Sequence, residues 1–517
     1  MNAYLIKTLA LNEVRLRTRR LSTLFALLAL VAIAWMMIPD VATGNTLISF
    51  SDRRVTYTSA TMALGSAAFG AILFGLFGFY LVRGRIAEDI RSGTGAVIGA
   101  TPVGNAMFLF CRWLGAVATL TALVTCFMLA IMALQLLRGE GPIEPLIYLQ
   151  TYALMMFPMI FFSAACAVLC DSVPLLMGKL GDVLFVFLWI GQLTLIAAQT
   201  PGETGVPAYL YLDMSGMASA GHALLTHMGS HFSLGASQFN PALPTLTMPT
   251  LMWTFDLAAA RFVVAAVAML PLLPAMLLFH RYSQDKVKLA RSRKRRSPLE
   301  VTDQLLRPLS RLTRPLFGMA AALPGLAGQV LADVALTLVA SPSSVAALLV
   351  MLLLSLLTPA AGLGGVLTGA VAAWGILVCS VATRDYDAGL EDMSGAVRGG
   401  IAQRFVRQYG ATVVLGLMFC GVAALRWSVA SPVRALAVVA GVLSLSAIAS
   451  MLGRCTRTAR TFLALFLFGL YIAVNAVKAP LVDAVGFNGV ATTASALTWL
   501  MAGAAALVLG YAWNRRG

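Results

Sequence analysis

Long apolar stretches alternate with short polar segments along almost the whole chain. A membrane-spanning helix requires about 20 mostly apolar residues, and about twelve stretches of the sequence approach or exceed that length. In the first half, these candidate spans cover residues 21–39, 59–82, 106–137, 148–170, 176–199 and 257–280. In the second half, they cover residues 342–358, 363–383, 408–425, 434–453, 460–477 and 493–513. The pattern predicts an all-α polytopic membrane protein with about twelve transmembrane helices in two six-helix halves.

The composition agrees with a surface that faces lipid. Hydrophobic residues make up 59% of the 517 residues, charged residues only 11%, and the mean hydropathy is +0.85. A soluble domain carries about 25% charged residues, so the polar side chains here are too few to cover a water-facing surface. The first apolar stretch is longer than the core of a usual signal peptide, and we expect it to remain in the protein as a span.

Basic residues are distributed unevenly among the segments that connect the spans. If the chain starts in the cytoplasm and alternates sides, 30 of its 37 Lys and Arg residues lie in cytoplasmic segments, six lie in outer segments, and Arg261 lies inside a span. Cytoplasmic loops of membrane proteins carry such an excess. We therefore expect a bacterial-type inner (plasma) membrane protein with both termini in the cytoplasm. The net charge of +16 does not indicate a nucleic-acid partner, because it is not gathered on a soluble surface.

A segment rich in arginine and proline separates the two halves. We predict a first six-helix half at residues 1–280, a basic cytoplasmic linker at 281–315 and a second six-helix half at 316–517. The first half opens with a segment from Tyr4 to Arg20 in which leucines mix with charged residues, as is typical of a helix lying in the membrane interface. Its counterpart in the second half runs from about Leu326 to Ser341 and is more apolar.

The two halves follow the same plan beyond these opening segments. Asp333 occupies in the second opening segment the place that Glu13 occupies in the first. Two spans later, each half has a short charged segment in which acidic residues precede a glycine. Each charged segment leads into a span with a similar beginning, around Arg112 in one half and Arg407 in the other. Internal repeats of this kind are frequent in transporters, so the pattern favours a duplication.

The charged segment of the first half ends in Gly93-Thr94 and is followed by Thr101-Pro102-Val103. Preceded by an interfacial helix and two spans, this order resembles the permeases of type 2 ATP-binding-cassette (ABC) exporters. In that family the charged segment is the coupling helix, which docks into a groove on the ATPase. The resemblance implies ATPase-coupling roles for Glu88, Asp89, Arg91, Gly93, Thr94, Arg384, Asp385, Asp387 and Gly389.

The second half departs from the family pattern, because its charged segment lacks the Gly-Thr and Thr-Pro pairs. Family members usually have six spans per chain and dimerise, so about twelve spans imply a fused pair. The residues themselves also favour a coupling role. A short helix that carries both charge signs can pair with partner charges through Glu88, Asp89 and Arg91. The apolar side chains of Ile86, Ile90 and Val97 can fill a groove on the partner. The alternative interpretation is a solvated turn.

The sequence contains no phosphate-binding loop of the form G-x-x-x-x-G-K-[ST]. Gly178-Lys179 lacks both the upstream glycine and the following Ser or Thr. We therefore expect that this chain holds no cofactor and does not hydrolyse ATP. The resemblance implies cytoplasmic ABC ATPase subunits, in two copies, as partners that supply the energy.

The predicted outer loop at residues 200–255 contains His222, His227 and His231. Histidines near methionines are able to bind a soft metal such as copper. Only His227 and His231 are spaced to share one helical face, so we expect no metal site. Short helices over the outer mouth of a transport pathway are the favoured interpretation of this loop.

Polar residues inside spans are candidates for lining such a pathway. Gln192 in the fifth predicted span and Asn475 in the eleventh lie at comparable depths in the two halves. The sequence thus indicates the permease of an ABC exporter that moves an apolar or amphipathic substrate (drug, lipid or peptide) outward by alternating access. One alternative is an ion-coupled secondary transporter, which needs acidic residues at mid-membrane. The other is a membrane-embedded enzyme acting on lipid-linked substrates, which needs clustered polar residues at one membrane face.

Overall fold

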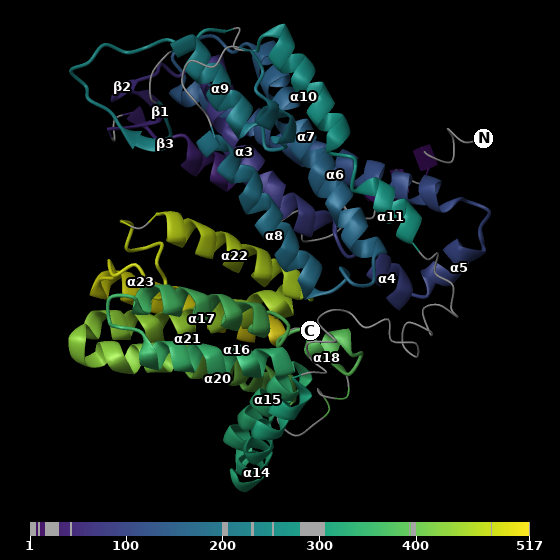
Figure 1. The fold of residues 1–517 in the computed structure, drawn as a ribbon, viewed down its shortest axis with the longest axis vertical. Helices are drawn as coiled ribbons and strands as arrows, with labels where there is room; N and C mark the ends of the chain where they lie inside the picture. Colours follow the sequence, from purple (N-terminus) through teal and green to yellow (C-terminus); the bar gives the residue numbers. More distant parts are fainter. Residues whose placement is uncertain are drawn as a thin grey trace. The chain divides into compact units, whose positions relative to one another are not determined.

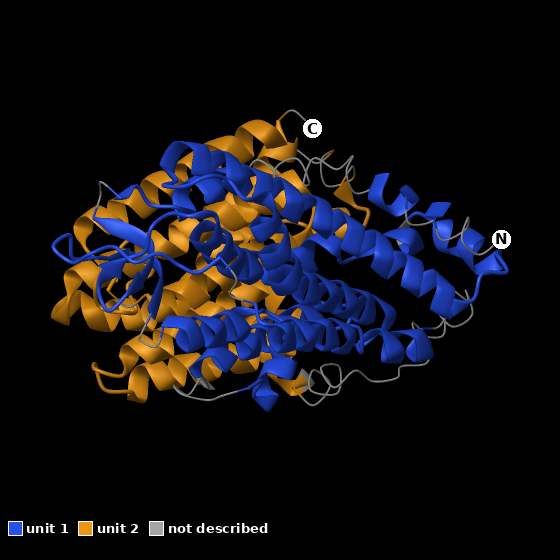
Figure 2. Cartoon of the chain, turned by 90° about the horizontal axis from the view of Figure 1, so that it is seen from above, with its two compact units in different colours: residues 1–293 blue, residues 294–517 orange. Residues whose placement is uncertain are grey.

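The computed structural model contains two compact units, Met1–Arg293 and Lys294–Gly517 (Figure 2). It describes residues 7–8, 11–15, 30–41, 44–198, 205–228, 232–250, 253–279, 306–391, 393, 396, 400–476 and 478–515. The boundary between the units falls within the predicted linker, of which residues 281–305 lie outside the described residues. Residues 21–29 of the first predicted span and most of the first interfacial segment also lie outside them.

Unit 1 is built around one central apolar helix, α3 (Figure 1). Its helices are α3 (Ser59–Val82), α4 (Arg85–Arg91), α5 (Thr94–Ala100), α6 (Asn105–Arg138), α7 (Pro145–Ser172), α8 (Lys179–Thr194), α9 (Met217–Met228), α10 (Phe255–Val267) and α11 (Leu272–Leu278), with 3-10 turns η2 (Leu195–Ala198) and η3 (Ala208–Leu212). α3, α6, α7 and α8 coincide with the second to fifth predicted spans. The sixth predicted span is interrupted between α10 and α11, at Pro271, which lacks a backbone N–H.

Small residues place α3 in the core of unit 1. Most of its 24 residues are buried, and it packs against α6, α7 and α8. A Cβ atom added to Gly75 would lie 2.2 Å from the Cε atom of Met159 on α7. The glycine therefore allows α7 to approach closely, as small residues do between membrane helices. Ser66 of α3 also exchanges a hydrogen bond with the Tyr152 hydroxyl of α7 at 2.8 Å.

Unit 1 also contains a small antiparallel sheet, which the sequence pattern did not predict. Its strands are β1 (Asn45–Phe50), β2 (Arg53–Arg54) and β3 (Phe232–Gln238), in the order β2-β1-β3. Ser51 and Asp52 connect β1 to β2 with φ values of 46° and 63°. Positive φ at both central residues matches the twist of a tight hairpin. β1 pairs with β3 although they are far apart in sequence, which a local hydropathy pattern does not reveal.

Unit 2 contains a bundle in which α21 packs between α20 and α23. Its helices are α14 (Arg314–Ala322), α15 (Gly325–Ala340), α16 (Pro342–Leu357), α17 (Leu363–Val378), α18 (Arg384–Asp387), α20 (Gly400–Ala430), α21 (Pro432–Thr456), α22 (Ala459–Asn475) and α23 (Thr493–Asn514), preceded by the 3-10 turn η4 (Arg307–Thr313). The chain bends by 102° between α15 and α16. Pro342, the first residue of α16, cannot continue the hydrogen bonding of α15, which explains a break at this position.

The number of spans can be compared with the prediction only over the described residues. Among these, eight helices are long and apolar enough to cross a membrane, and α15 with α16 makes a ninth candidate if the bent pair is one span. The shorter apolar helices α17 and α22 coincide with the eighth and eleventh predicted spans. The chain is therefore a predominantly helical protein with several membrane-spanning candidates, and the count of twelve stays a prediction.

Candidate functional site

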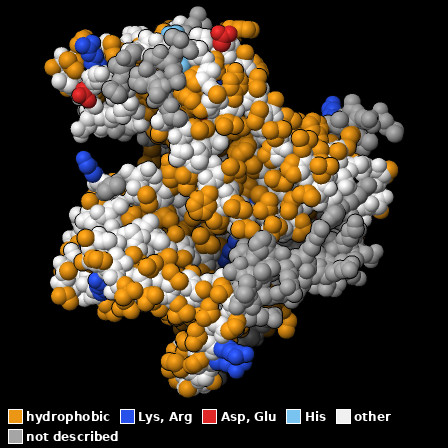
Figure 3. Space-filling model, viewed as in Figure 1, with side chains coloured by type: hydrophobic (Ala, Val, Ile, Leu, Met, Phe, Trp, Pro, Cys, Tyr) orange, Lys and Arg blue, Asp and Glu red, His pale blue; other side chains and the backbone are white. Residues whose placement is uncertain are grey.

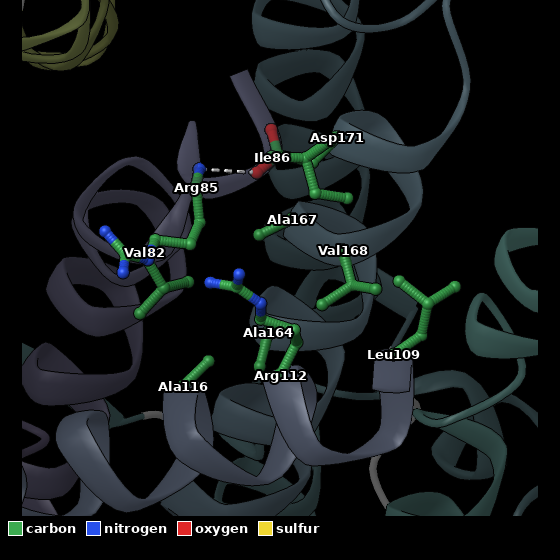
Figure 4. Close-up of a pocket in the computed structure, with 10 residues that line it drawn as sticks. All are labelled: Val82, Arg85, Ile86, Leu109, Arg112, Ala116, Ala164, Ala167, Val168 and Asp171. Carbon is green, nitrogen blue, oxygen red and sulfur yellow. Dashed lines mark hydrogen bonds between the residues drawn. The ribbon is translucent and has the colours of Figure 1, made fainter. Parts of the chain in front are cut away.

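The first charged segment (residues 85–94) folds as α4 followed by the start of α5. Gly84 and Gly93 border α4 with φ values of 90° and 74°, which glycine adopts without strain. The carboxylate of Asp171, near the end of α7, accepts backbone hydrogen bonds from Gly84 at 2.8 Å and from Arg85 at 2.9 Å (Figure 4). A carboxylate in this position satisfies donors that a helix leaves open and complements its dipole. α7 therefore holds the beginning of α4.

An arginine of α6 connects this segment to the interfacial segment. The guanidinium of Arg112 pairs with Glu13 at 2.8 Å and also with Asp89 of α4. Only 4% of Asp89 is exposed, and Glu13 is buried as well. Charged hydrogen bonds shielded from water in this way hold their groups firmly. We call Glu13, Asp89 and Arg112 the first clamp.

Arg85 adds a second cation beside the first clamp. Its Nε atom lies 3.5 Å from Glu13, and its Nη1 atom lies 2.9 Å from Glu88. Burial opposes the charge of Arg85, but Glu13, Glu88 and Asp89 outweigh it and raise the pKa of the guanidinium. A small pocket lies between these side chains and the apolar residues of α6 and α7 (Figure 4). Arg85 and Arg112 together thus pair with the three carboxylates of Glu13, Glu88 and Asp89.

Unit 2 contains an arrangement of the same residue types in the same chain order. Arg407 of α20 pairs with Asp333 of α15 at 2.8 Å and lies 3.8 Å from Asp385 of α18. We call Asp333, Asp385 and Arg407 the second clamp. In each clamp, an arginine at the beginning of a long helix joins an acid of the opening segment to an acid of the charged segment.

The two charged segments differ in their other anchors. In unit 2, Glu391 pairs with Arg454 of α21 at 2.8 Å and with Arg404 of α20 at 3.4 Å. Arg454 also donates to Asn514 of α23 at 2.9 Å. α18 has only four residues, and Asp392 lies outside the described residues. The second segment is therefore shorter as a helix but tied to three helices of its unit.

A buried arginine fixes the other side of the first charged segment. Arg83, between α3 and α4, pairs with Asp182 of α8 at 2.7 Å and lies 3.8 Å from Asp171 of α7. Its side chain has no exposed area. Asp182 lies near the beginning of the fifth predicted span. No local signal could have paired it with Arg83, because the two are separated by α6 and α7.

Asp89 does not present its charge at the surface as expected, because Arg112 holds it inside unit 1. Glu88 is more exposed and pairs with Arg85. Ile86 is buried within unit 1 and is not available to a partner, whereas Ile90 and Val97 are both exposed, Val97 at 70%. The surface of α4 and α5 therefore offers Glu88 and two apolar side chains to a partner.

The remaining residues of the predicted coupling site have local roles or lie outside the described part. The side chain of Arg91 is outside it. Thr94 begins α5 and exchanges a hydrogen bond with Ser92 at 2.8 Å. Arg384 donates to the Thr337 hydroxyl of α15, which adds to the second clamp.

The turn after α18 completes the second charged segment. Gly389 follows α18 with a φ of 68°, and its N–H donates to Tyr386 at 3.1 Å. The backbone N–H of Asp387 donates to Thr383 at 2.9 Å. These contacts are those of a tight helix end.

The predicted pathway residues are engaged in local hydrogen bonds. The side-chain oxygen of Gln192 accepts from the backbone N–H of Met214 at 2.8 Å, which ties α8 to the segment before α9. The side chain of Asn475 is exposed and donates to Tyr471 one turn earlier at 2.8 Å. Neither contact bears on transport, and the pathway role of both residues stays a prediction.

A second buried ion pair connects α10 to the segment between η3 and α9. Arg261 lies 3.7 Å from the carboxylate of Asp213 and donates to Leu154 of α7 at 2.8 Å. Asp213 accepts from the backbone of Gly216 and Ser219 at 2.9 and 2.8 Å. The ion pair therefore holds the turn before α9 next to α7 and α10.

The histidines of the predicted outer loop are not gathered in the described part of the chain. His222 on α9 hydrogen-bonds to the carbonyl of Gly205 at 2.9 Å. His227 lies five residues later on α9, and His231 lies outside the described residues. No cluster of three His, Cys, Asp or Glu side chains suited to a metal occurs among the described residues.

The comparisons with known proteins leave the site as the main source of functional evidence. No protein-family model, curated protein or solved structure matches the chain. The two clamps, and the helices that carry them, are the features of the described residues that bear on function.

Proposed function

We propose that this chain is the membrane-embedded permease of an ATP-driven ABC exporter. Separate cytoplasmic ABC ATPase subunits would hydrolyse ATP, and the permease would move an apolar or amphipathic substrate outward by alternating access. One observation carries the proposal. Each unit ties its charged segment to a long helix through an arginine clamp, at Arg112 in unit 1 and at Arg407 in unit 2.

The clamps support force transmission from a docked partner. To move α4 independently of α6, the buried ion pair of Asp89 with Arg112 must separate. That separation is unfavourable, because it leaves two charges poorly solvated. Asp171 adds two backbone hydrogen bonds that join α4 to α7. A push on α4 would therefore move α6 and α7 with it. This stiffness is what a coupling helix requires and what a solvated turn does not need.

The surface of the first charged segment supports docking of a protein. Exposed Ile90 and Val97 provide apolar contact area next to the charge of Glu88. Protein interfaces combine an apolar centre with charges at the rim in this way. The separation of roles is clear: Asp89 holds the segment, whereas Glu88, Ile90 and Val97 contact the partner.

The buried carboxylates do not favour ion-coupled transport. Asp171 and Asp182 lie beside Arg83, and Asp213 lies beside Arg261. Coupling to protons or sodium requires an intramembrane carboxylate that can exchange its ligand. Acids held by an arginine and by backbone N–H groups are poorly suited to that exchange.

Co-purification of the full-length chain from its native membrane tests the proposal. We expect a stoichiometric ATPase whose activity responds to substrate. Changing Glu88 to Lys together with Val97 to Asp should abolish binding of this ATPase. A matched variant with Glu144→Lys and Leu146→Asp alters an exposed acid and an exposed leucine at the opposite end of α6 and α7, and it should bind normally.

Two results would contradict the proposal. The first is a purified, transport-competent chain without any ATPase. The second is equal ATPase binding by both double variants, which would leave the charged segment without a role in docking.

A further inference from the structure

Unit 2 opens with a helical hairpin that leads away from its long helices. α14 packs on α15, and the turn between them contains Pro324. The 102° bend before α16 directs α15 across the direction of that helix. Asp333 and Arg407 join α15 to the beginning of α20. Figure 1 shows α14 at the far end of this hairpin, extending away from α17, α20 and α21.

The hairpin exposes an apolar strip. None of the nine residues of α14 is buried. Met319 is 56% exposed, and Leu323, one turn later, is exposed on the same side of the helix. Leu312 in η4, Phe317 in α14 and Leu326 at the beginning of α15 are also exposed. Exposed apolar side chains gathered in one hairpin mark contact with a membrane or a partner.

Basic side chains border this strip. Arg311 and Arg314 are exposed, and neither forms an ion pair with another described residue. Helical spacing places Arg314 and Gly318 on one side of α14, next to the side that carries Met319. Figure 3 shows Lys or Arg side chains beside hydrophobic ones at the end of the molecule where Figure 1 places α14. The segment is thus amphipathic, with a basic polar side.

We propose that α14 lies in the plane of the membrane surface and binds anionic lipid. Leu312, Met319 and Leu323 enter the leaflet, and Arg311 and Arg314 bind the phosphates of anionic headgroups. Exposed apolar side chains flanked by arginines are typical of a helix that lies in the membrane interface. We favour the bilayer over a protein partner for two reasons. The hairpin is joined directly to the membrane-spanning candidates of unit 2, and the 102° bend turns α15 across the direction of α16. Binding of α14 to lipid requires membrane insertion of the chain but no ATPase. Its test is therefore independent of the proposed function.

The depth of α14 can be measured with fluorophores on single cysteines. The seven native cysteines are first replaced by Ala or Ser, and the full-length chain is reconstituted in phosphatidylethanolamine–phosphatidylglycerol vesicles. A label at Met319→Cys should be quenched by doxyl-labelled lipid and protected from aqueous iodide. A label at Gly318→Cys, where the structure has open space, should show the reverse. Strong iodide quenching at both positions would overturn the proposal.

The anionic preference is tested on the chain with its native cysteines, so it does not depend on the cysteine-free variant. Native mass spectrometry compares the retention of phosphatidylglycerol with that of phosphatidylcholine. Two arginines near a phosphate surface should favour the anionic lipid by about tenfold. The double change Arg311→Gln and Arg314→Gln should remove this tenfold contribution, while the other basic residues of the chain keep theirs. The matched change Arg457→Gln and Arg515→Gln, which also removes two arginines of unit 2, should not.

Two further outcomes would refute the lipid assignment. Equal lipid preference in both double variants would show that the arginines do not bind headgroups. Protection of Met319→Cys from iodide only when an ATPase subunit is added, without quenching by doxyl lipid, would assign the strip to a protein interface.

Discussion

Replacing Arg112 by Met isolates the contribution of the first clamp. Methionine keeps the length of the apolar part of the side chain and removes the guanidinium. The change removes the guanidinium that pairs with the buried carboxylate of Asp89. Glu13 keeps a neighbour, because Arg85 lies 3.5 Å away. Both carboxylates therefore lose one cation, and the charge of Arg85 compensates each of them in part.

The burial of the pair sets the expected magnitude. Removing one partner of a buried ion pair costs about 3–5 kcal/mol. The Arg112 side chain is 11% exposed, and Arg85 rescues part of the loss, so we expect the free energy of unfolding to fall by about 3 kcal/mol. Arg407→Met should cost only about 1 kcal/mol. Its side chain is 26% exposed and lies 3.8 Å from Asp385, so water screens the second clamp more strongly.

A double-mutant cycle in mixed micelles measures the coupling. Unfolding of the full-length chain by sodium dodecyl sulfate is followed by circular dichroism for Arg112→Met, Asp89→Leu and the double variant. In Arg112→Met the carboxylate of Asp89 loses its paired guanidinium, and Asp89→Leu removes that carboxylate. The double variant should therefore lose about 2 kcal/mol less than the sum of the two single losses. Additive losses within about 0.5 kcal/mol would show that the two side chains do not interact, and the reasoning would be refuted.

The other predictions concern packing, capping and topology. Gly75→Ala should destabilise the chain by about 1–3 kcal/mol in the same assay, because the added methyl meets Met159, whereas Gly191→Ala, where no atom lies within 4 Å, should cost almost nothing. Asp171→Leu should cost about 1–3 kcal/mol by leaving the backbone donor of Gly84 unpaired, and faster hydrogen exchange in α4 would locate the effect. Protease should cut tags at both termini only in permeabilised spheroplasts; cleavage in intact ones would contradict the predicted orientation.

Hydropathy predicted the long helices well because apolarity over about 20 residues is a local property of the sequence. The second predicted span and α3 both cover residues 59–82. The bend before α16 and the division of the sixth span depend on neighbouring packing as well as on proline, and the sequence pattern did not reveal them. The strands were missed because β2 has two residues and β1 pairs with a segment from the other end of unit 1.

The sequence predicted which residues belong to the candidate site but not which of them contact one another. Position in the repeat related Glu13 to Asp333 and Arg112 to Arg407, and the structure adds that each arginine binds the acid of its own half. The partner of Asp89 could not be predicted, because a charge in a short polar segment is expected to face water. Arg112 lies about two turns inside an otherwise apolar span. An arginine in that position is a signal for a buried carboxylate nearby.

The sheet in unit 1 has a consequence for biosynthesis. β3 is translated roughly 180 residues after β1, which corresponds to about 10–40 s at ribosomal speed. During that interval the edge of β1 has no strand to pair with, and an unpaired edge is a template for wrong partners. The pairing of β1 with β3 is therefore a late step of assembly, completed only after the intervening membrane helices have been made.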